Sequence, residues 1–474
     1  MDDHRRHLGR GFNWLGGATV IARVVDFATI LAVLMFLTKA EVGTASLVIS
    51  IGMMIEALDG LGTGDAMVQA PVLTPHVRDT LFWVGLASSL AVALLTLLAA
   101  PLIAALYGMA GMAGYFAAIA AKQPLVAGAV VPMALMNRDL QYERIAIVNV
   151  GATLAAALTR LGLAVAGAGA WSLVIGFASS GFFTLLGAWI ARPFRPGWRP
   201  DLPAVLPLLR FGLQSMTANL FTQTFKNVDY LLVGWFYGPA PLAVYRVAFD
   251  VAMEPAMAVS TLLNRTALPV FARVAAVRDH LAQTFAWSLG RVAVLVAPLM
   301  AGLVMAAGPL MALLHDENGH SYAAAALPLR ILAVAALLRT CFQLLSPVMM
   351  GSGQPGLAAR LSAATLLLLS IGVAAAGIFF PPRPGIVAVS AVWLVVYPLL
   401  WVWGRFYLRR RWDLRLRDLA RAFRVPALAI AGQVALVLVP GMLAGDDNRI
   451  RLGIVIAATA LTYAALFLYT RRKS

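Results

Sequence analysis

The chain has 474 residues, of which 61% are hydrophobic and only 12% are charged, about half of the charged share of a soluble domain. A soluble fold could not bury that much apolar surface, so the composition indicates an integral membrane protein. The net charge is +16, but no nucleic-acid motif is present, so nucleic acid is not an expected partner. The single cysteine, Cys341, excludes an internal disulfide and a thiolate metal cage.

Apolar runs of about 20 residues, the length that crosses a bilayer, recur along the whole chain, and we predict about fourteen spans. Their predicted ranges are 12–37, 43–67, 80–106, 112–136, 145–167, 171–190, 206–236, 242–270, 285–310, 323–349, 357–380, 385–403, 425–443 and 452–469. The first run is too long for a cleavable signal. The intervening loops are short, which disfavours a soluble catalytic domain, and no GxxxxGK[ST] loop for ATP occurs.

Arginine and lysine residues alternate between well-supplied and poorly supplied loops. The rich segments carry Arg5, Arg6, Arg10, Arg78, Arg138, Arg144, Arg192, Arg195, Arg199, Arg273, Arg278, Arg360, the basic run 409–424, Arg471, Arg472 and Lys473. Because basic loops stay in the cytoplasm, this alternation predicts an even number of spans and both termini in the cytoplasm of a bacterial inner membrane.

The sequence resembles itself at a spacing of roughly 200–210 residues, which predicts two parallel lobes of six helices around a central cavity. The expected fold is therefore all-α, with a C-terminal helix pair added to the two lobes. The predicted parts are a first lobe at 1–191, a cytoplasmic linker and hinge at 192–209, a second lobe at 210–404, a basic amphipathic interfacial segment at 405–424 and an accessory helix pair at 425–474.

Ionisable residues at membrane depth concentrate in the helices that open each predicted half, and such residues usually face a cavity or a partner. Four cations are candidates for binding an anionic cargo: Arg23, Lys226, Arg246 and Arg339. Four carboxylates are candidates for proton or sodium coupling: Asp26, Glu56, Asp250 and Glu254. Secondary cavity candidates are Asp59, Arg160, Asp229, Arg265, Arg291 and Arg330.

Structural alternatives stay open for most of these residues. The pairs Arg23–Asp26 and Lys226–Asp229 are spaced i,i+3 and could neutralise each other on one helix. Arg160 and Arg246 lie near helix ends, where a long side chain can reach the interface. The segment 315–320 contains histidine, aspartate and glutamate, but a solvated turn is the expected structure, so no metal site and no catalytic residue is predicted.

Several short motifs resemble the Wzx-type polysaccharide flippases of the multidrug/oligosaccharidyl-lipid/polysaccharide exporter superfamily. The matching segments are Glu41-Val42-Gly43, Asp59-Gly60-Leu61-Gly62 through Gln69, Gly197-Trp198-Arg199-Pro200, Leu209-Arg210-Phe211-Gly212, Asn227-Val228-Asp229 through Phe271, Leu327-Pro328-Leu329-Arg330 and Gly353-Gln354-Pro355. The resemblance covers nearly the whole chain and is carried by glycines and prolines more than by charged positions.

This resemblance implies a transporter and not an enzyme. It implies that undecaprenyl-pyrophosphate-linked oligosaccharide units move from the cytoplasmic to the periplasmic leaflet by alternating access, for surface or exopolysaccharide synthesis. Membrane lipids, a polysaccharide polymerase and glycosyltransferases are then the expected partners, and proton or sodium coupling takes the place of a cofactor. The alternatives are a cation-coupled multidrug antiporter or a cell-wall precursor flippase of the same superfamily, with a membrane glycosyltransferase or ligase disfavoured.

Overall fold

The computed structural model describes residues 22, 24–198, 201–274, 278–412, 416–443, 445 and 447–471, apart from the side chains of several helical stretches, chiefly 261–270, 272–274, 278–280 and 405–412. Apart from one isolated bridge between His315 and Ser321, every regular element among these residues is a helix. The prediction of an all-helical membrane protein is confirmed. Eleven helices of the described ranges are long and apolar enough to cross a membrane.

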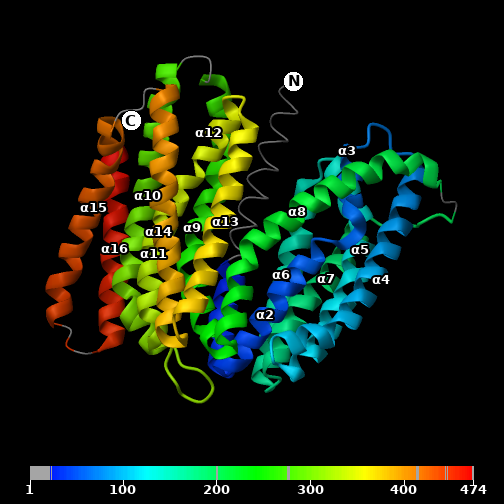
Figure 1. The fold of residues 1–474 in the computed structure, drawn as a ribbon, viewed down its shortest axis with the longest axis horizontal. Helices are drawn as coiled ribbons and strands as arrows, with labels where there is room; N and C mark the ends of the chain where they lie inside the picture. The colour runs from blue at the N-terminus through cyan, green and yellow to red at the C-terminus, as the bar shows by residue number, and fades with distance from the viewer. Residues whose placement is uncertain are drawn as a thin grey trace. The chain divides into compact units, whose positions relative to one another are not determined.

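The chain divides into two compact units, Met1–Ala240 with Asp316–Asn318, and Pro241–His315 with Gly319–Ser474 (Figure 1). The first unit contains η1 (Leu34–Phe36), α2 (Lys39–Glu56), η2 (Asp59–Gly62), α3 (Thr63–Gln69), α4 (Pro75–Leu106), η3 (Ala110–Gly114), α5 (Tyr115–Arg138), α6 (Tyr142–Val165), α7 (Ala170–Ala191) and α8 (Leu202–Tyr237). The second unit contains α9 (Pro239–Val274), α10 (Arg278–Leu313), η4 (Ala323–Ala325), α11 (Ala326–Gln343), α12 (Leu345–Gly351), α13 (Pro355–Phe379), α14 (Pro382–Trp412), α15 (Leu416–Leu443) and α16 (Asn448–Arg471). The first two residues of α9 belong to the first unit, because the second begins at Pro241.

The predicted spans from 43–67 onward each coincide with a helix or a broken helix. The predicted spans 206–236 and 242–270 correspond to α8 and α9, which are 36 residues each but are absent from the eleven membrane-capable helices. The first predicted span is represented by the short apolar helix Val24–Phe36. The count of fourteen spans and the arrangement of lobes therefore stay predictions.

The predicted linker 192–209 packs on the first unit, which continues beyond the linker to Ala240. The Asp79 carboxylate of α4 accepts a hydrogen bond from the Gly197 amide at 2.9 Å, and the Trp83 indole donates to the Gly197 carbonyl at 2.9 Å. The helix that follows, α8, also packs on α2, η2 and α3. Contacts thus divide the chain at Ala240, while the repeat boundary at the linker stays a prediction.

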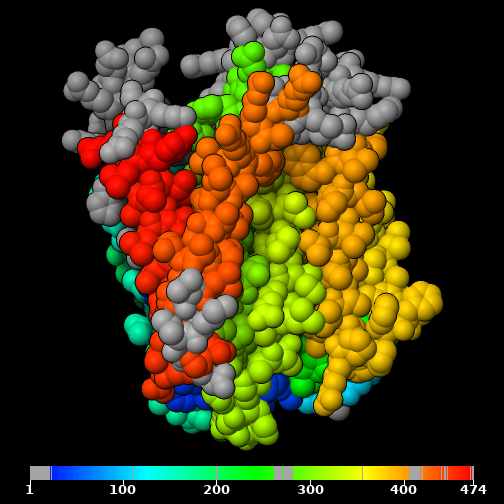
Figure 2. Space-filling view, turned by 90° about the vertical axis from the view of Figure 1, so that its left-hand side faces the viewer, coloured from blue at the N-terminus to red at the C-terminus, as the bar shows by residue number. Residues whose placement is uncertain are grey.

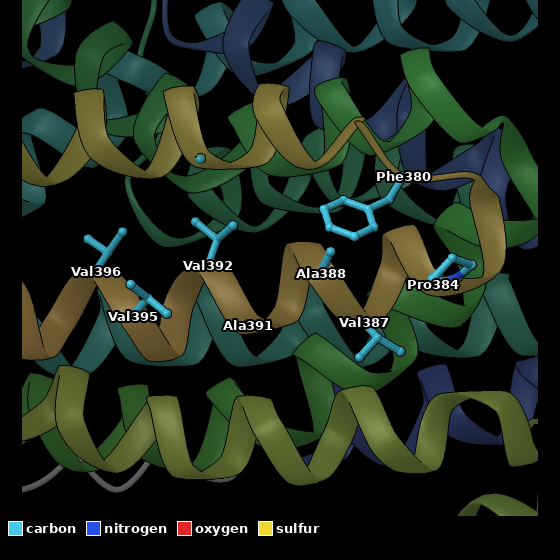
Figure 3. A pocket seen from close by; sticks show the side chains of 9 residues that line it. Phe380, Pro384, Val387, Ala388, Ala391, Val392, Val395 and Val396 are labelled. Atoms are coloured by element: carbon cyan, nitrogen blue, oxygen red, sulfur yellow. The ribbon is translucent and has the colours of Figure 1, made fainter. Parts of the chain in front are cut away.

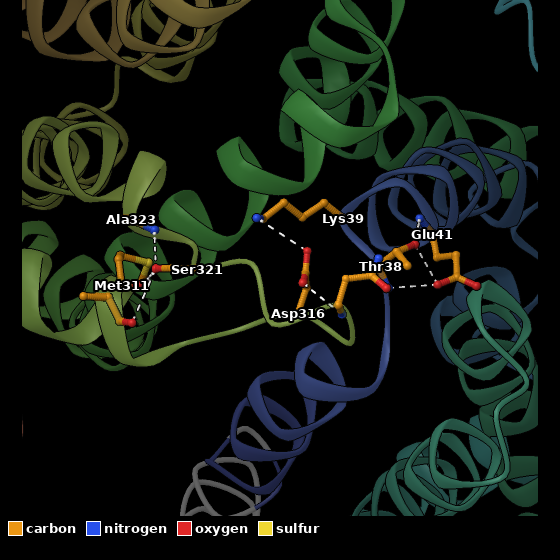
Figure 4. Close-up of polar contacts among 9 residues, drawn as sticks. Thr38, Lys39, Glu41, Met311, Asp316, Ser321 and Ala323 are labelled. Carbon is orange, nitrogen blue, oxygen red and sulfur yellow. Dashed lines mark hydrogen bonds and ion pairs between the residues drawn. The ribbon is translucent and has the colours of Figure 1, made fainter.

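Two further predicted segments differ in detail. Residues 405–412 continue α14 and 416–424 begin α15, so the basic stretch is shared between two long helices. In the segment 315–320, Asp316 is buried, although a solvated turn was expected, and its carboxylate lies 3.5 Å from the Lys39 ammonium (Figure 4). The neighbouring Thr38 and Glu41 form a reciprocal capping box that starts α2.

A helix break in the middle of the span Lys39–Gln69 separates α2 from α3. Gly60, Leu61 and Gly62 all have left-handed backbone angles, with φ of 61°, 50° and 67°. Glycine adopts this region freely, whereas Leu61 does so at a cost of about 1–2 kcal/mol. Because unpaired backbone groups are costly in a bilayer, such a break is found where protein or a cavity covers it.

The break is covered by α8, through a backbone contact between two glycines. A Cβ atom on Gly212 would lie 2.5 Å from the Leu61 carbonyl oxygen and 3.1 Å from that of Gly62. Only a residue without a side chain allows this approach. The two motifs that resemble the flippase family, around Gly62 and Gly212, are therefore in direct contact.

We expect Gly212→Ala to lower the free energy of unfolding by about 1–3 kcal/mol, because the neighbour of the new methyl group is backbone that cannot move aside. Gly151→Ala in α6 is the matched control, since a Cβ there meets nothing within 4 Å. A helical glycine in open space gains about 0.5–1 kcal/mol on replacement by alanine, so the two variants should shift the melting temperature in detergent in opposite directions. Equal shifts would contradict the close approach.

Candidate functional site

The helix break of the first unit holds Asp59 in a polar environment. The Ser89 hydroxyl of α4 donates a short hydrogen bond to Asp59 Oδ1. Asp59 Oδ2 is buried and makes no hydrogen bond within the described part of the chain. A buried carboxylate oxygen without a donor is costly, so it provides an acceptor position for a proton or a cation.

A buried lysine lies close to this carboxylate. The Lys122 side chain of α5 is only 5% exposed, and its ammonium donates to Glu56 Oε2 at 2.8 Å. The same ammonium lies 3.5 Å from the ring centroid of Phe177 in α7, which adds a cation–π contact. Glu56, Asp59 and Lys122 thus bring two carboxylates and one ammonium together inside the first unit. We call these three residues the lysine centre.

A second ion pair of the first unit joins residues that are far apart in the sequence. The Arg160 guanidinium of α6 lies 2.6 Å from Asp26 Oδ1, and the Arg160 side chain is 11% exposed. Gly176 of α7 permits this packing, because a Cβ there would lie 2.6 Å from Arg160 Cβ. Arg160 and Asp26 are therefore paired across helices, and whether Arg160 also reaches the interface stays a prediction.

The second unit contains a buried guanidinium. Arg339 of α11 is 7% exposed; its Nη1 lies 3.6 Å from Met253 Sδ of α9, and its Cζ lies 5.4 Å from the Trp393 ring centroid of α14. Its Nε has no hydrogen-bond partner, and no carboxylate of the described residues forms an ion pair with it. A buried cation without a counter-charge is costly, so it indicates a site for an anion that binds from outside the chain.

An aromatic cluster supports Trp393, whose ring contacts Arg339. The Trp393 indole donates to the Tyr245 hydroxyl at 3.0 Å, and the Trp393 ring packs at 5.2 Å against Phe249. Tyr397 continues this group, with its ring 6.2 Å from that of Trp393. The α9 rings therefore fix Trp393, and the guanidinium lies between Trp393 of α14 and Met253 of α9.

The other predicted residues are divided between the units. Arg246 pairs with Asp250 on α9, with Nε 3.2 Å from Oδ2, and Glu254 is half-buried on the same helix. On α8, Asp229 is buried and Lys226 is exposed. Arg291 and Arg330 are exposed, whereas Arg23 and the side chain of Arg265 lie outside the described residues. The predicted cavity bounded by the opening helices of both halves stays a prediction.

A pocket of about 670 Å³ on the second unit is not a polar site. It is lined by Gly372 of α13, by Phe380 and by one side of α14 from Pro384 to Val396 (Figure 3). Every lining residue is apolar, so the pocket suits hydrocarbon and not the charged part of a substrate.

Sequence reasoning missed Lys122, Ser89 and Trp393. A lysine in the middle of the predicted span 112–136 was itself a signal, because a cation at that depth needs a partner. Its partner Glu56 is 66 residues away, so inspection of i,i+3 and i,i+4 pairs along one helix could not identify it.

Comparison with known proteins identifies the family. The sequence profile of the family described as "Polysaccharide biosynthesis protein" matches residues 30–323. The chain belongs to this family. It is 23% identical to the lipopolysaccharide biosynthesis protein WzxC of Escherichia coli over 70% of this chain and 67% of WzxC. It is also 23% identical to the teichuronic acid biosynthesis protein TuaB of Bacillus subtilis over 100% of this chain and 98% of TuaB. The predicted Wzx-type resemblance is confirmed.

Solved structures establish the fold. The lipid II flippase MurJ in an inward closed conformation matches with a TM-score of 0.72 at 12% identity, over 96% of this chain and 99% of that chain. An inward-facing multidrug resistance MATE transporter matches with a TM-score of 0.66 at 14% identity, over 82% and 95%. This multi-pass membrane protein therefore has a transporter fold shared by flippases and drug exporters. The fold by itself does not distinguish between these activities.

Proposed function

We propose that this protein moves lipid-linked oligosaccharide units across a bacterial inner membrane for polysaccharide synthesis, and that it catalyses no covalent chemistry. The observation that carries the proposal is the buried Arg339 guanidinium, which has no carboxylate partner among the described residues, in a chain of the polysaccharide biosynthesis family. The relatives named above are biosynthesis proteins of lipopolysaccharide and of teichuronic acid. The cargo would carry an undecaprenyl pyrophosphate.

Arg339 would bind the anionic group of the cargo. A guanidinium offers several donors in a plane that matches phosphate oxygens, and such charge-assisted hydrogen bonds are strong where water is excluded. Arg23, Lys226 and Arg246 are proposed to add positive charge along the path. The Arg246–Asp250 pair would have to rearrange for Arg246 to contact an anion.

The lysine centre is proposed to couple transport to a proton or sodium gradient. Its two carboxylates exceed the charge of Lys122 by one, and Asp59 Oδ2 has no donor within the described residues. One added proton or monovalent cation would balance the site, so its occupancy would change the packing of α2, α4 and α5. Asp26, Asp250 and Glu254 remain further candidates for the coupling ion.

A cation-coupled drug antiporter is the second candidate function, because the MATE fold matches as well. A drug antiporter would require a site for organic cations, and the buried Arg339 disfavours one in the second unit. A cell-wall precursor flippase shares the anionic cargo chemistry, and only the cargo sugars would distinguish it. The basic loops favour both termini in the cytoplasm. Glycosyltransferases and a polymerase, on the two sides of the membrane, are the proposed partners.

Deleting the gene is expected to abolish a surface polysaccharide, while the lipid-linked unit accumulates in the cytoplasmic leaflet. Polysaccharide is measured by immunoblot or sugar analysis, and leaflet location by the access of an impermeant glycosidase to spheroplasts. Complementation with the intact gene is the control. Normal polysaccharide in the deletion strain, or lipid-linked units already in the outer leaflet, would disprove the proposed function.

A further inference from the structure

A groove of about 650 Å³ lies among α10, α15 and α16 of the second unit. Gly290 of α10 and Ala422 of α15 are in close contact beside it, because a Cβ on Gly290 would lie 3.1 Å from the Ala422 carbonyl oxygen. A second pocket of about 420 Å³ shares Val425, Leu466 and Tyr469 with the first, so the groove continues along α15 and α16. Figure 2 shows these two helices at the surface of the unit, with α15 crossing the visible face obliquely.

Most polar groups of the groove have partners within the protein. The Gln433 amide donates to the Thr459 hydroxyl at 2.8 Å, and the Tyr463 hydroxyl donates to the Leu295 carbonyl. Arg291 is different, because it is exposed and its guanidinium lies 5.0 Å over the Trp287 ring. None of the described carboxylates forms an ion pair with it. The groove therefore combines apolar walls with one available cation.

Counting residues along the span places Arg291 just inside one edge of the hydrocarbon layer. The span Leu281–Leu313 has 33 residues, which at 1.5 Å per residue is about 50 Å, whereas the hydrocarbon layer is about 30 Å thick. If the layer is centred on the span, it begins about 10 Å from Leu281, and Arg291 lies about 15 Å from Leu281. An arginine side chain can span that difference, so its guanidinium reaches the boundary where phosphates lie.

We propose that this groove binds a bilayer phospholipid with an anionic headgroup. Its phosphate would accept hydrogen bonds from the Arg291 guanidinium, and an acyl chain would lie along Val425, Leu466 and the continuing pocket. The exposed Arg291 charge at this end of the groove favours phosphatidylglycerol or cardiolipin over a zwitterionic lipid. This lipid is a bound component and is separate from the transported cargo.

The test uses the purified full-length protein and native mass spectrometry with added dioleoyl phosphatidylglycerol or dioleoyl phosphatidylcholine. We expect the anionic lipid to bind more tightly and to raise the melting temperature more. Arg291→Gln should weaken its binding by about 10-fold to 100-fold, the effect of losing one charged hydrogen-bonding group. Arg360→Gln, which removes an exposed arginine near the start of α13, is the matched control and should bind like the unmodified protein.

Two results would overturn the proposal. A loss of binding in Arg291→Gln that is no larger than the loss in Arg360→Gln would show that this groove does not govern binding of the anionic headgroup. Preferential binding of undecaprenyl phosphate over phosphatidylglycerol, lost in Arg291→Gln, would assign the groove to the cargo and not to a bilayer lipid. Polysaccharide synthesis in cells is a separate measurement, so failure of the proposed transport function would not affect the binding result.

Discussion

Replacing Glu56 with glutamine is expected to lower the free energy of unfolding by about 3 kcal/mol, because it removes the counter-charge of a buried lysine. Lys122 is 5% exposed, and Glu56 accounts for its one ion pair among the described residues. Asp59 lies nearby but is bonded to Ser89, so it offsets only part of the loss. The effect is measured as the loss of melting temperature in detergent, with exposed Glu143→Gln as the control.

The double variant Glu56→Gln/Lys122→Met tests the reason for this loss. Removing both charges leaves no unpaired ion, so its stability should return to near that of the unmodified protein, and the double-mutant cycle should give a coupling energy of about 3 kcal/mol. If the lysine centre couples transport to an ion gradient, this stable double variant should still fail to restore polysaccharide in a deletion strain. Normal transport by the double variant would limit the pair to a structural role.

The helices could be predicted from the sequence because apolar length alone determines what crosses a bilayer. The predicted span 171–190, for example, corresponds to α7 at Ala170–Ala191, one of the eleven membrane-capable helices. The break at Gly60–Gly62 was not predicted, although its glycines were noted as a motif. Its cause is tertiary: the break is accommodated by the approach of Gly212, about 150 residues later in the chain.

The candidate site residues could likewise be predicted only where no contact with a distant part of the chain was needed. Arg339 was identified from the sequence, because an arginine deep in an apolar helix stands out whether or not its neighbours are known. The Lys122–Glu56 and Arg160–Asp26 pairs join residues 66 and 134 positions apart, which no helical spacing rule can connect. Charges that pair across helices therefore require the structure, whereas an isolated buried charge can be found without it.

Replacing Arg339 with alanine is expected to reduce surface polysaccharide by about 10-fold or more, because one charge-assisted contact contributes about 1.5–3 kcal/mol. The same change should leave the melting temperature equal or higher. A buried guanidinium without a carboxylate destabilises the protein that carries it, so its removal relieves that cost at the expense of function. Polysaccharide is measured by complementation, and protein in the membrane fraction by immunoblot.

Two further variants separate charge from packing at this site. Arg339→Lys keeps the positive charge but loses the planar donor set, so it should retain part of the activity. Arg330→Ala removes an exposed arginine from the same helix and should transport normally. If Arg339→Ala lost stability and activity together, the guanidinium would be a packing element held by Met253 and Trp393. Loss of activity at unchanged stability is the result that only an anion-binding role predicts.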